Sequence, residues 1–403
     1  MKKQWILPAM TAAVCLSVLS MTGCGAQRSA GDYYKSGMEC LAGGSYEEAE
    51  KYFSMALDKK KDKAEYYIAD GYAFTKLGDY EKAREQFDKA VLDKENQIVR
   101  ENNKMAYRGK ALSYYEENDY GNALVFLDKA LDIPVSKELD IDLLSYKGDV
   151  LCRTEKYEEA RKVFTEILKQ DKKNARIYEK RAYVYEKENK IDKAQEDLDL
   201  ALKYDGKNRE RYIQKYLFLK RVKKEDEAKD VLEEALGLKV RTAEDTCYYG
   251  RFLYYKGDQK KAAEKLEKAW DDGAFEAYYF LGMIQQEQGE KDKAKLCYQK
   301  YAEKDKNGQY VAASYNQLGL LCAEEEDYSN ALSWFQKGLE KKNANEDRNL
   351  QYNMVITLEK MGDYERAGLA ADAYVNSYGA TDGMKQEQEF IESRIEEGKI
   401  SNE

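Results

Sequence analysis

The most regular feature of the sequence is a pair of short amphipathic segments joined by a Leu-Gly-Asp-Tyr turn. In residues 71–90, GYAFTKLGDYEKAREQFDKA, small and apolar residues recur at helical spacing on both sides of that turn. Gly78 suits the left-handed conformation that ends a helix, and Asp79 can accept hydrogen bonds from the free N–H groups that begin the next one. The pattern therefore predicts two helices that fold back on each other, neither of which can bury its apolar stripe alone.

The same pattern returns along most of the chain. One small residue of the second helix recurs ten times, at separations of 32 to 40 residues: Ala49, Ala83, Ala123, Ala160, Ala194, Ala228, Ala262, Ala294, Ala331 and Ala367. Nine of the ten are followed four residues later by Phe, Tyr or Leu, and eight are preceded twelve residues earlier by Gly or Ala. The small residues let helix backbones approach, and the large side chain fills the space beside them. Each helix pair is therefore expected to pack on its neighbours.

This arrangement resembles the tetratricopeptide repeat, and the resemblance covers residues 30–378. It implies an all-α fold, a right-handed superhelical solenoid of about ten helix-turn-helix repeats over residues 31–380. An amphipathic segment at 381–397 is predicted to cap the stack, and residues 398–403 are predicted to form a flexible tail. Where the family often has proline after the second helix, this chain mostly has Lys, Asp or Glu, which we interpret as a change in turn chemistry.

The first 24 residues have the pattern of a secretory signal. Lys2 and Lys3 precede an apolar run over residues 5–19, which is followed by Met-Thr-Gly-Cys at 21–24. These four residues resemble the bacterial lipobox, whose cysteine receives a diacylglycerol before everything in front of it is removed. We predict a signal peptide at 1–23, lipidation of Cys24, and a short tether at 24–30. The apolar run is too short for an uncleaved anchor, because a spanning helix needs about 20 residues.

Charge and the predicted lipid together indicate where the protein resides. The net charge is −9, and removing Lys2 and Lys3 with the signal makes the mature chain more acidic. An acidic balance disfavours nucleic acid as a partner and gives no general attraction to anionic lipid, so acyl chains must supply the membrane affinity. We predict a lipid-anchored protein on the extracytoplasmic face of the cell membrane. Since residue 25 is not Asp, the outer membrane is possible in a two-membrane bacterium.

Several kinds of chemistry are excluded by composition. The chain contains no histidine, which removes Ser–His and Cys–His nucleophiles and histidine metal sites. No glycine-rich phosphate loop precedes a helix. Apart from Cys15 and Cys24, the cysteines stand singly, without a CxxC pair, and are interpreted as small packing residues: Cys40, Cys152, Cys247, Cys297 and Cys322. We therefore predict no enzymatic activity, no cofactor and no metal.

Tyrosine is unusually abundant, at 35 residues. Several tyrosines begin second helices and brace the turn, whereas others fall on the face of the first helices that lines the concave groove in the family. Tyr and Arg suit recognition because they combine a large contact area with directional polar ends. The candidate groove residues are Tyr115, Arg153, Tyr183, Arg251, Tyr254, Tyr279 and Tyr352. The alternative interpretation is that these tyrosines only pack within the fold, at half-exposed positions.

Three functions fit these features. The first is a membrane-anchored scaffold that binds a peptide or helix of an envelope or secreted protein in its groove. The second is an assembly factor, similar to a pilotin, for a secretion, pilus or cell-wall machine. The third is a lipid-anchored binding protein for a glycan or small solute, which would need a deep aromatic pocket. The family's Lys/Asn clamp for a partner's terminal carboxylate is not reproduced here.

Overall fold

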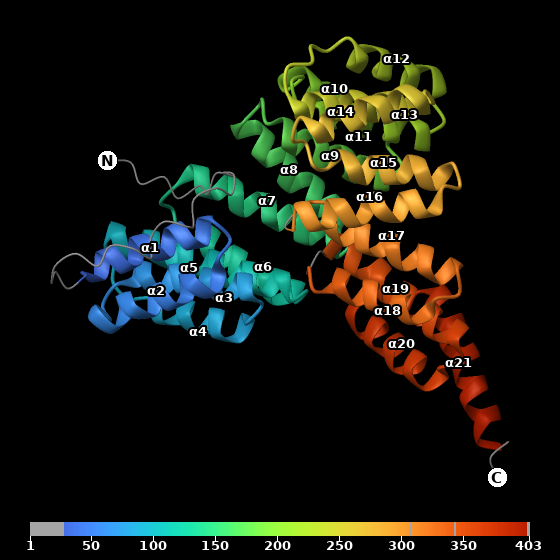
Figure 1. Ribbon diagram of the computed structural model, residues 1–403. Helices are drawn as coiled ribbons and strands as arrows, with labels where there is room; N and C mark the ends of the chain where they lie inside the picture. The colour runs from blue at the N-terminus through green and yellow to red at the C-terminus, as the bar shows by residue number, and fades with distance from the viewer. Residues whose placement is uncertain (1–27, 307, 342–343, 401–403) are drawn as a thin grey trace. The chain divides into compact units, whose positions relative to one another are not determined.

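The computed structural model describes residues 28–306, 308–341 and 344–400. These residues form helices and the turns that join them, with no strand (Figure 1). The chain divides into two compact units that meet between Asp205 and Gly206. We describe each unit by itself.

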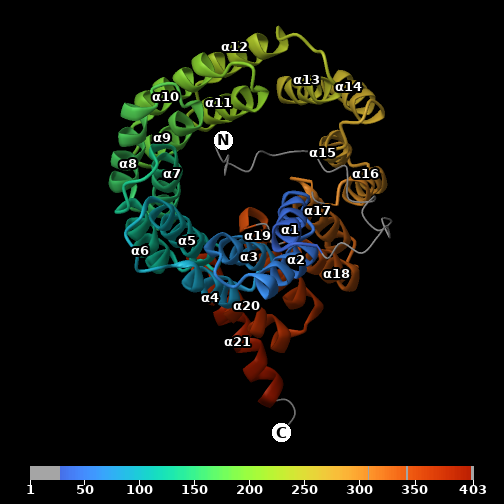
Figure 2. The same ribbon diagram turned by 90° about the vertical axis from the view of Figure 1, so that its left-hand side faces the viewer.

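The first unit contains five successive helix pairs. Within it, every helix packs on the helix before it and the helix after it. Figure 2 shows α7 on the inner side of this curved stack and α8 on its outer side. The helices are α1 (Ala30–Ala42), α2 (Tyr46–Lys59), α3 (Ala64–Leu77), α4 (Tyr80–Ala90), α5 (Gln97–Glu116), α6 (Tyr120–Leu131), α7 (Lys137–Arg153), α8 (Tyr157–Gln170), α9 (Ala175–Lys187) and α10 (Ile191–Tyr204).

The second unit contains five further pairs and a final helix. Its helices are α11 (Arg209–Arg221), α12 (Glu225–Leu236), α13 (Ala243–Lys256), α14 (Gln259–Asp271), α15 (Ala277–Glu287), α16 (Lys291–Lys304), α17 (Val311–Glu324), α18 (Tyr328–Leu339), α19 (Ala344–Met361), α20 (Tyr364–Tyr378) and α21 (Asp382–Ile400). The last helix packs on α20, burying Met384 and Ile391, and it extends beyond residue 397, where the sequence pattern ends.

The turns within the pairs have the predicted chemistry. Gly78 is left-handed, with φ of 78°, and the Asp79 carboxylate accepts a hydrogen bond from the backbone N–H of Lys82. At the equivalent position, five pairs place a residue that is not glycine in the same left-handed region: Asn118, Glu155, Asn189, Lys223 and Glu326. This conformation is strained for L-residues, so packing of the two helices, not glycine alone, determines the turn.

The predicted repeat core is confirmed. All ten aligned alanines, from Ala49 to Ala367, are completely buried. Phe87 shows why the small residues are needed, because a Cβ added at Gly71 or at Gly109 would lie closer than 3.0 Å to its ring carbons. One aromatic ring of α4 therefore occupies the space left by glycines on α3 and α5. The core is a series of thin layers, each shared by neighbouring pairs.

One buried carboxyl makes the stability of the first unit depend on pH. Asp70 on α3 is 2% exposed, and its Oδ1 has no hydrogen-bond partner among the described residues. Burial, with a smaller effect of Glu50, raises the pKa of Asp70 from its usual 3.8 to about 7, although Lys89 opposes the shift. The folded state therefore binds this proton more tightly than the unfolded state does. Its contribution to stability is complete below pH 3.8 and is lost as the pH rises to 7.

We expect Asp70→Asn to raise the free energy of unfolding at pH 8 by up to about 4 kcal/mol, because the neutral amide has no charge to bury. At pH 4 the variant should match the wild type, since Asp70 is then already protonated in the folded state. Urea unfolding at both pH values, followed by circular dichroism, measures the difference. An equal effect of the substitution at pH 4 and pH 8 would contradict this account of Asp70.

Candidate functional site

All seven predicted groove residues lie on first helices. Tyr115 is on α5, Arg153 on α7, Tyr183 on α9, Arg251 and Tyr254 on α13, Tyr279 on α15 and Tyr352 on α19. Four are half-buried, Arg153 and Tyr183 are exposed, and Arg251 is buried. Because the repeat register places equivalent positions on equivalent faces, neighbouring candidates in one unit come together.

The first unit brings three candidates into one cluster, which we call the Arg153 cluster: Tyr115, Arg153 and Tyr183. The Arg153 guanidinium donates a hydrogen bond to the Tyr115 phenol oxygen. Tyr183 interacts electrostatically with the same guanidinium and is 45% exposed. Burial raises the pKa of both tyrosines above the usual value. Both phenols are therefore neutral at physiological pH and can donate and accept hydrogen bonds, next to a cation that stays charged.

A neighbouring residue of the cluster did not emerge from the sequence. The Tyr146 ring on α7 lies 6.3 Å from the Tyr115 ring and 5.5 Å from the guanidinium of Arg108. Arg108 also donates a hydrogen bond to Tyr72 at 2.9 Å and pairs with Asp142 at 2.6 Å. The sequence did contain a pattern that identifies this residue. Tyr146 stands two helical turns before Arg153 and so lies on the same face of α7.

Arg251 does not lie on an open surface, contrary to the prediction. It is 3% exposed, with its guanidinium 4.7 Å from the Tyr248 ring centre and 4.3 Å from the Phe280 ring centre. Its Nη2 pairs with Glu210 at 2.9 Å. Residues from α11, α13 and α15 thus enclose the cation, and aromatic faces and a carboxylate stabilise it. Arg251 joins three helices and offers almost no surface to a partner.

The remaining candidates in the second unit have partners within the chain. The Tyr254 hydroxyl donates to Glu287, and the Tyr279 ring stacks on Tyr310 with 4.7 Å between centres. Burial raises the pKa of Tyr279 to about 12. Tyr352 packs near Tyr374 at 6.1 Å, in the core around α19 and α20. These tyrosines contribute mainly packing.

The cysteines lie within the repeats as separate thiols. Cys247, Cys297 and Cys322 are buried, while Cys40 and Cys152 are half-buried. Burial raises the pKa of Cys297 to about 11 and that of Cys152 to about 12, so these thiols are protonated and poorly nucleophilic at neutral pH. Across the described residues, no group of three acidic or thiol side chains could hold a metal ion.

The membrane prediction concerns residues outside those that the structure describes. Cys24 and the preceding signal segment belong to residues 1–27, whose structure is not described. Among the helices described, none has both the length and the apolar character needed to cross a bilayer.

Helix pairs stacked in register, each sharing its core with the next, define a helical-repeat protein. Models of one family, described as tetratricopeptide repeat, match residues 34–98, 69–134 and 147–209, and also 275–307 and 312–345. Together they cover more than half of the chain. The chain belongs to the tetratricopeptide-repeat family, as its alanine register predicted. No curated protein matches it.

Solved structures resemble the chain in fold. The human IFIT1 dimer with m7Gppp-AAAA is 18% identical, with 85% of this chain and 84% of that chain covered and a TM-score of 0.45. Yeast Tom70 is 14% identical, with 92% and 96% covered and a TM-score of 0.37. PilF of Pseudomonas aeruginosa is 19% identical, with 56% and 97% covered and a TM-score of 0.41. At these identities the likeness concerns the fold alone.

Proposed function

We propose that the chain is a membrane-anchored interaction scaffold that binds a segment of a partner protein on the first-helix face of its N-terminal unit. Tetratricopeptide-repeat proteins are generally scaffolds for protein interactions and are typically not catalytic. The observation that carries the proposal is the Arg153 cluster, in which exposed Tyr183 and half-buried Tyr115 adjoin one cation. Aromatic and arginine side chains at a partly buried site are typical of the residues that dominate binding energy.

The chemistry of the cluster indicates how the partner segment is bound. Two neutral phenols and a guanidinium can pair with backbone carbonyls or a carboxylate of the partner, while the tyrosine rings cover its apolar side chains. Two nearby cations pair with carboxylates, Lys180 with Asp149 at 2.6 Å and Arg108 with Asp142. Arg153 is exposed and adjoins both tyrosines, and we expect its guanidinium to take part in recognition.

The anchor is the second half of the proposal. Lys2, Lys3, the apolar run and the Met-Thr-Gly-Cys sequence support lipidation at Cys24 and a position on the extracytoplasmic side of the cell membrane. With only residues 24–30 as a tether, the first repeat would lie within about 20 Å of the lipid surface. A partner bound to the N-terminal unit would thus be held next to the membrane. This position suits a partner that is an envelope or secreted protein.

Photocrosslinking in intact cells tests the binding face. With a benzophenone amino acid at position 183, we expect a discrete crosslinked protein, and Arg153→Ala should reduce its yield about tenfold or more, the loss of a contact worth at least about 1.4 kcal/mol. The matched control places the crosslinker at exposed position 125 on α6, where that protein should not be captured. A second control, Lys162→Ala at an exposed position of α8, should leave the yield unchanged.

The proposed face is wrong if positions 183 and 125 capture the same proteins, or if Arg153→Ala has no effect on the crosslink. Mass spectrometry of the captured protein also distinguishes a single bound partner from a secretion, pilus or wall machine, which would yield several subunits of one assembly.

A further inference from the structure

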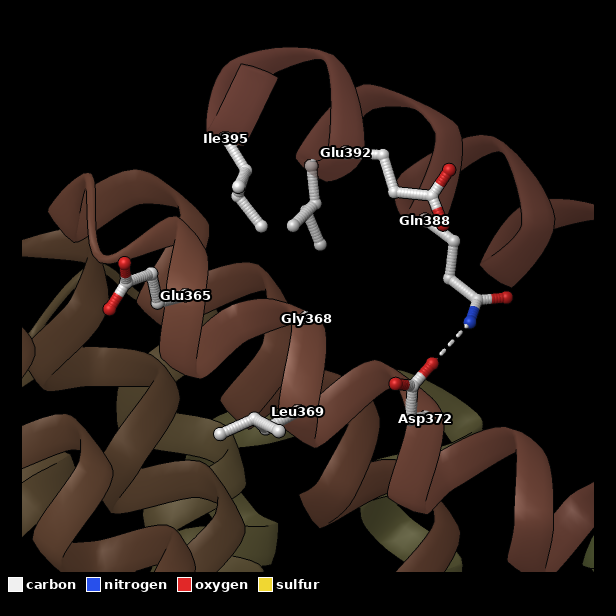
Figure 3. Close-up of a pocket in the computed structure, with 8 residues that line it drawn as sticks. Glu365, Gly368, Leu369, Asp372, Gln388, Glu392 and Ile395 are labelled. Atoms are coloured by element: carbon white, nitrogen blue, oxygen red, sulfur yellow. Dashed lines mark hydrogen bonds between the residues drawn. The ribbon is translucent and has the colours of Figure 1, made fainter. Parts of the chain in front are cut away.

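A second candidate surface lies between α20 and the final helix α21. It is a groove with a cavity volume of about 220 Å³, lined by Glu365, Gly368, Leu369, Asp372, Gln388, Ile391, Glu392 and Ile395. Figure 3 shows Leu369 and Ile395 on opposite helices, with a hydrogen bond from Gln388 to Asp372, 3.0 Å long, closing one end. The groove is far from the Arg153 cluster in sequence and belongs to the other unit.

The repeat register explains why the groove is open. In earlier pairs, the residue after the aligned alanine reaches the next pair. Leu124 and Leu332 at this position pack against the core of the following helix pair, and Arg84 stacks on Tyr114 of the next first helix, 4.5 Å from its ring centre. The equivalent residue of α20 is Gly368, which has no side chain. Among the described residues, no second helix follows α21 to cover this place.

The groove has an apolar floor with an exposed anchor. Ile391 is buried at its base, while Leu369 is 72% exposed, the most exposed large apolar side chain among the described residues. A Cβ at Gly368 would have only ordinary contacts, 3.7 Å from Ile391 and Ile395. Small-molecule sites occupy about 300–1,000 Å³. This smaller cavity fits one or two apolar side chains of a docked helix better than a free cofactor or sugar.

The rim of the groove is acidic and unneutralised. Glu365 on α20 and Glu392 on α21 form no ion pair within the described part of the chain. The nearby cations are engaged elsewhere, since Arg366, Lys385 and Arg394 each pair with an acidic residue three positions away. A basic helix would therefore gain attraction from both sides of the groove. The α21 helix of a second copy is itself rich in glutamate and would be repelled.

We propose that this groove binds a basic amphipathic helix of a partner protein in the place where a further second helix of the repeat stack would lie. Apolar side chains at i, i+3 and i+4 of that helix pack on Leu369, Ile391 and Ile395, as in other helix-in-groove complexes. Its Lys or Arg residues pair with Glu365 and Glu392. This site is independent of the binding face on the N-terminal unit.

Fluorescence anisotropy with a labelled synthetic peptide tests the site. The probe is a helical peptide of leucine and lysine, with leucines at i, i+3, i+4 and i+7, and the comparison peptide has glutamate in place of lysine. We expect Leu369→Asp to weaken binding of the lysine peptide at least tenfold, and the pair Glu365→Lys with Glu392→Lys to weaken it at least as much. Binding should also weaken as salt is raised, and the glutamate peptide should not bind.

Matched controls distinguish peptide binding at the groove from nonspecific attraction to this acidic protein. Leu296→Asp removes a comparably exposed leucine on α16, and Glu389→Lys reverses an exposed charge on α21 outside the groove. Both variants should bind the lysine peptide with unchanged affinity. Circular dichroism checks that each variant keeps its helix content, since all of the substituted side chains are at least partly exposed.

The proposal is overturned if Leu369→Asp and Leu296→Asp bind the lysine peptide equally, or if the glutamate peptide binds as well as the lysine peptide. It is also overturned if light scattering shows a dimer of the wild type that Leu369→Asp dissociates, because the groove would then be an interface between two copies. Failure of the crosslinking experiment at position 183 would leave these outcomes unaffected.

Discussion

Replacing Phe87 with alanine is expected to lower the free energy of unfolding by about 3–5 kcal/mol, the usual cost of deleting a fully buried aromatic side chain. Phe87 is completely buried and joins three helices, because its ring fills the space beside Gly71 on α3 and Gly109 on α5. Its removal should therefore weaken the packing of one pair on the next as well as the packing within a pair. Urea unfolding followed by circular dichroism measures the loss.

The glycines opposite the ring make this prediction sharper. Gly109→Ala should destabilise the wild type by about 1–3 kcal/mol, because the added Cβ collides with the ring of Phe87. In the Phe87→Ala background the same substitution should stabilise by up to about 1 kcal/mol, since the collision is gone and alanine favours the helix. The control Gly121→Ala, at an open and exposed position in α6, should stabilise in both backgrounds. Additive effects of Gly109→Ala and Phe87→Ala would contradict the packing described.

Replacing Cys24 with alanine is expected to abolish lipid incorporation completely, the largest functional effect that we predict. The thiol of Cys24 is the atom to which the diacylglycerol is attached in the lipobox that residues 21–24 resemble, and alanine offers no substitute. Two or more acyl chains give stable attachment, whereas a single chain binds a membrane only marginally. Metabolic labelling with radioactive palmitate, followed by gel electrophoresis of the purified protein, measures incorporation.

The mass of the purified protein is a second measurement for the same variant. Cell fractionation alone is ambiguous, because a variant that retains the apolar segment would also be found with the membranes. The Cys24→Ala chain should keep residues 1–23, since cleavage follows lipidation, whereas the wild type should begin at a modified residue 24. Cys40→Ala, which removes a thiol inside α1, should be labelled and cleaved like the wild type. Label that persists in Cys24→Ala would exclude lipidation at this residue.

The sequence alone predicted which residues of each repeat face the core. The ten alanines, the large residue four positions later and the glycines twelve positions earlier were all found by periodicity. The structure buries every one of those alanines and places the large side chains against the glycines. The reason is local: a helix pair of fewer than 40 residues sets which side of each helix is apolar, and the register then repeats.

The surroundings of long polar side chains were decided only by the tertiary structure. Register placed Arg251 on the first-helix face, but its guanidinium turned inward because Glu210 and Phe280, from the preceding and following pairs, enclose it. Arg153, one helical turn later in the repeat register, is exposed beside half-buried Tyr115 and exposed Tyr183. A long flexible side chain follows its partners, and these come from other repeats.

In the groove beside α21, too, the sequence predicts some features and only the tertiary structure decides the others. The sequence by itself determined an amphipathic final helix after the last pair, with apolar Ile391 and Ile395 among glutamates. That Gly368 and Leu369 remain uncovered depends on which helices are present to pack on α20. The chain's periodicity thus determined what each helix buries. Only the assembled stack decided which surfaces stay open, because burial at a repeat's edge is a property of its neighbours.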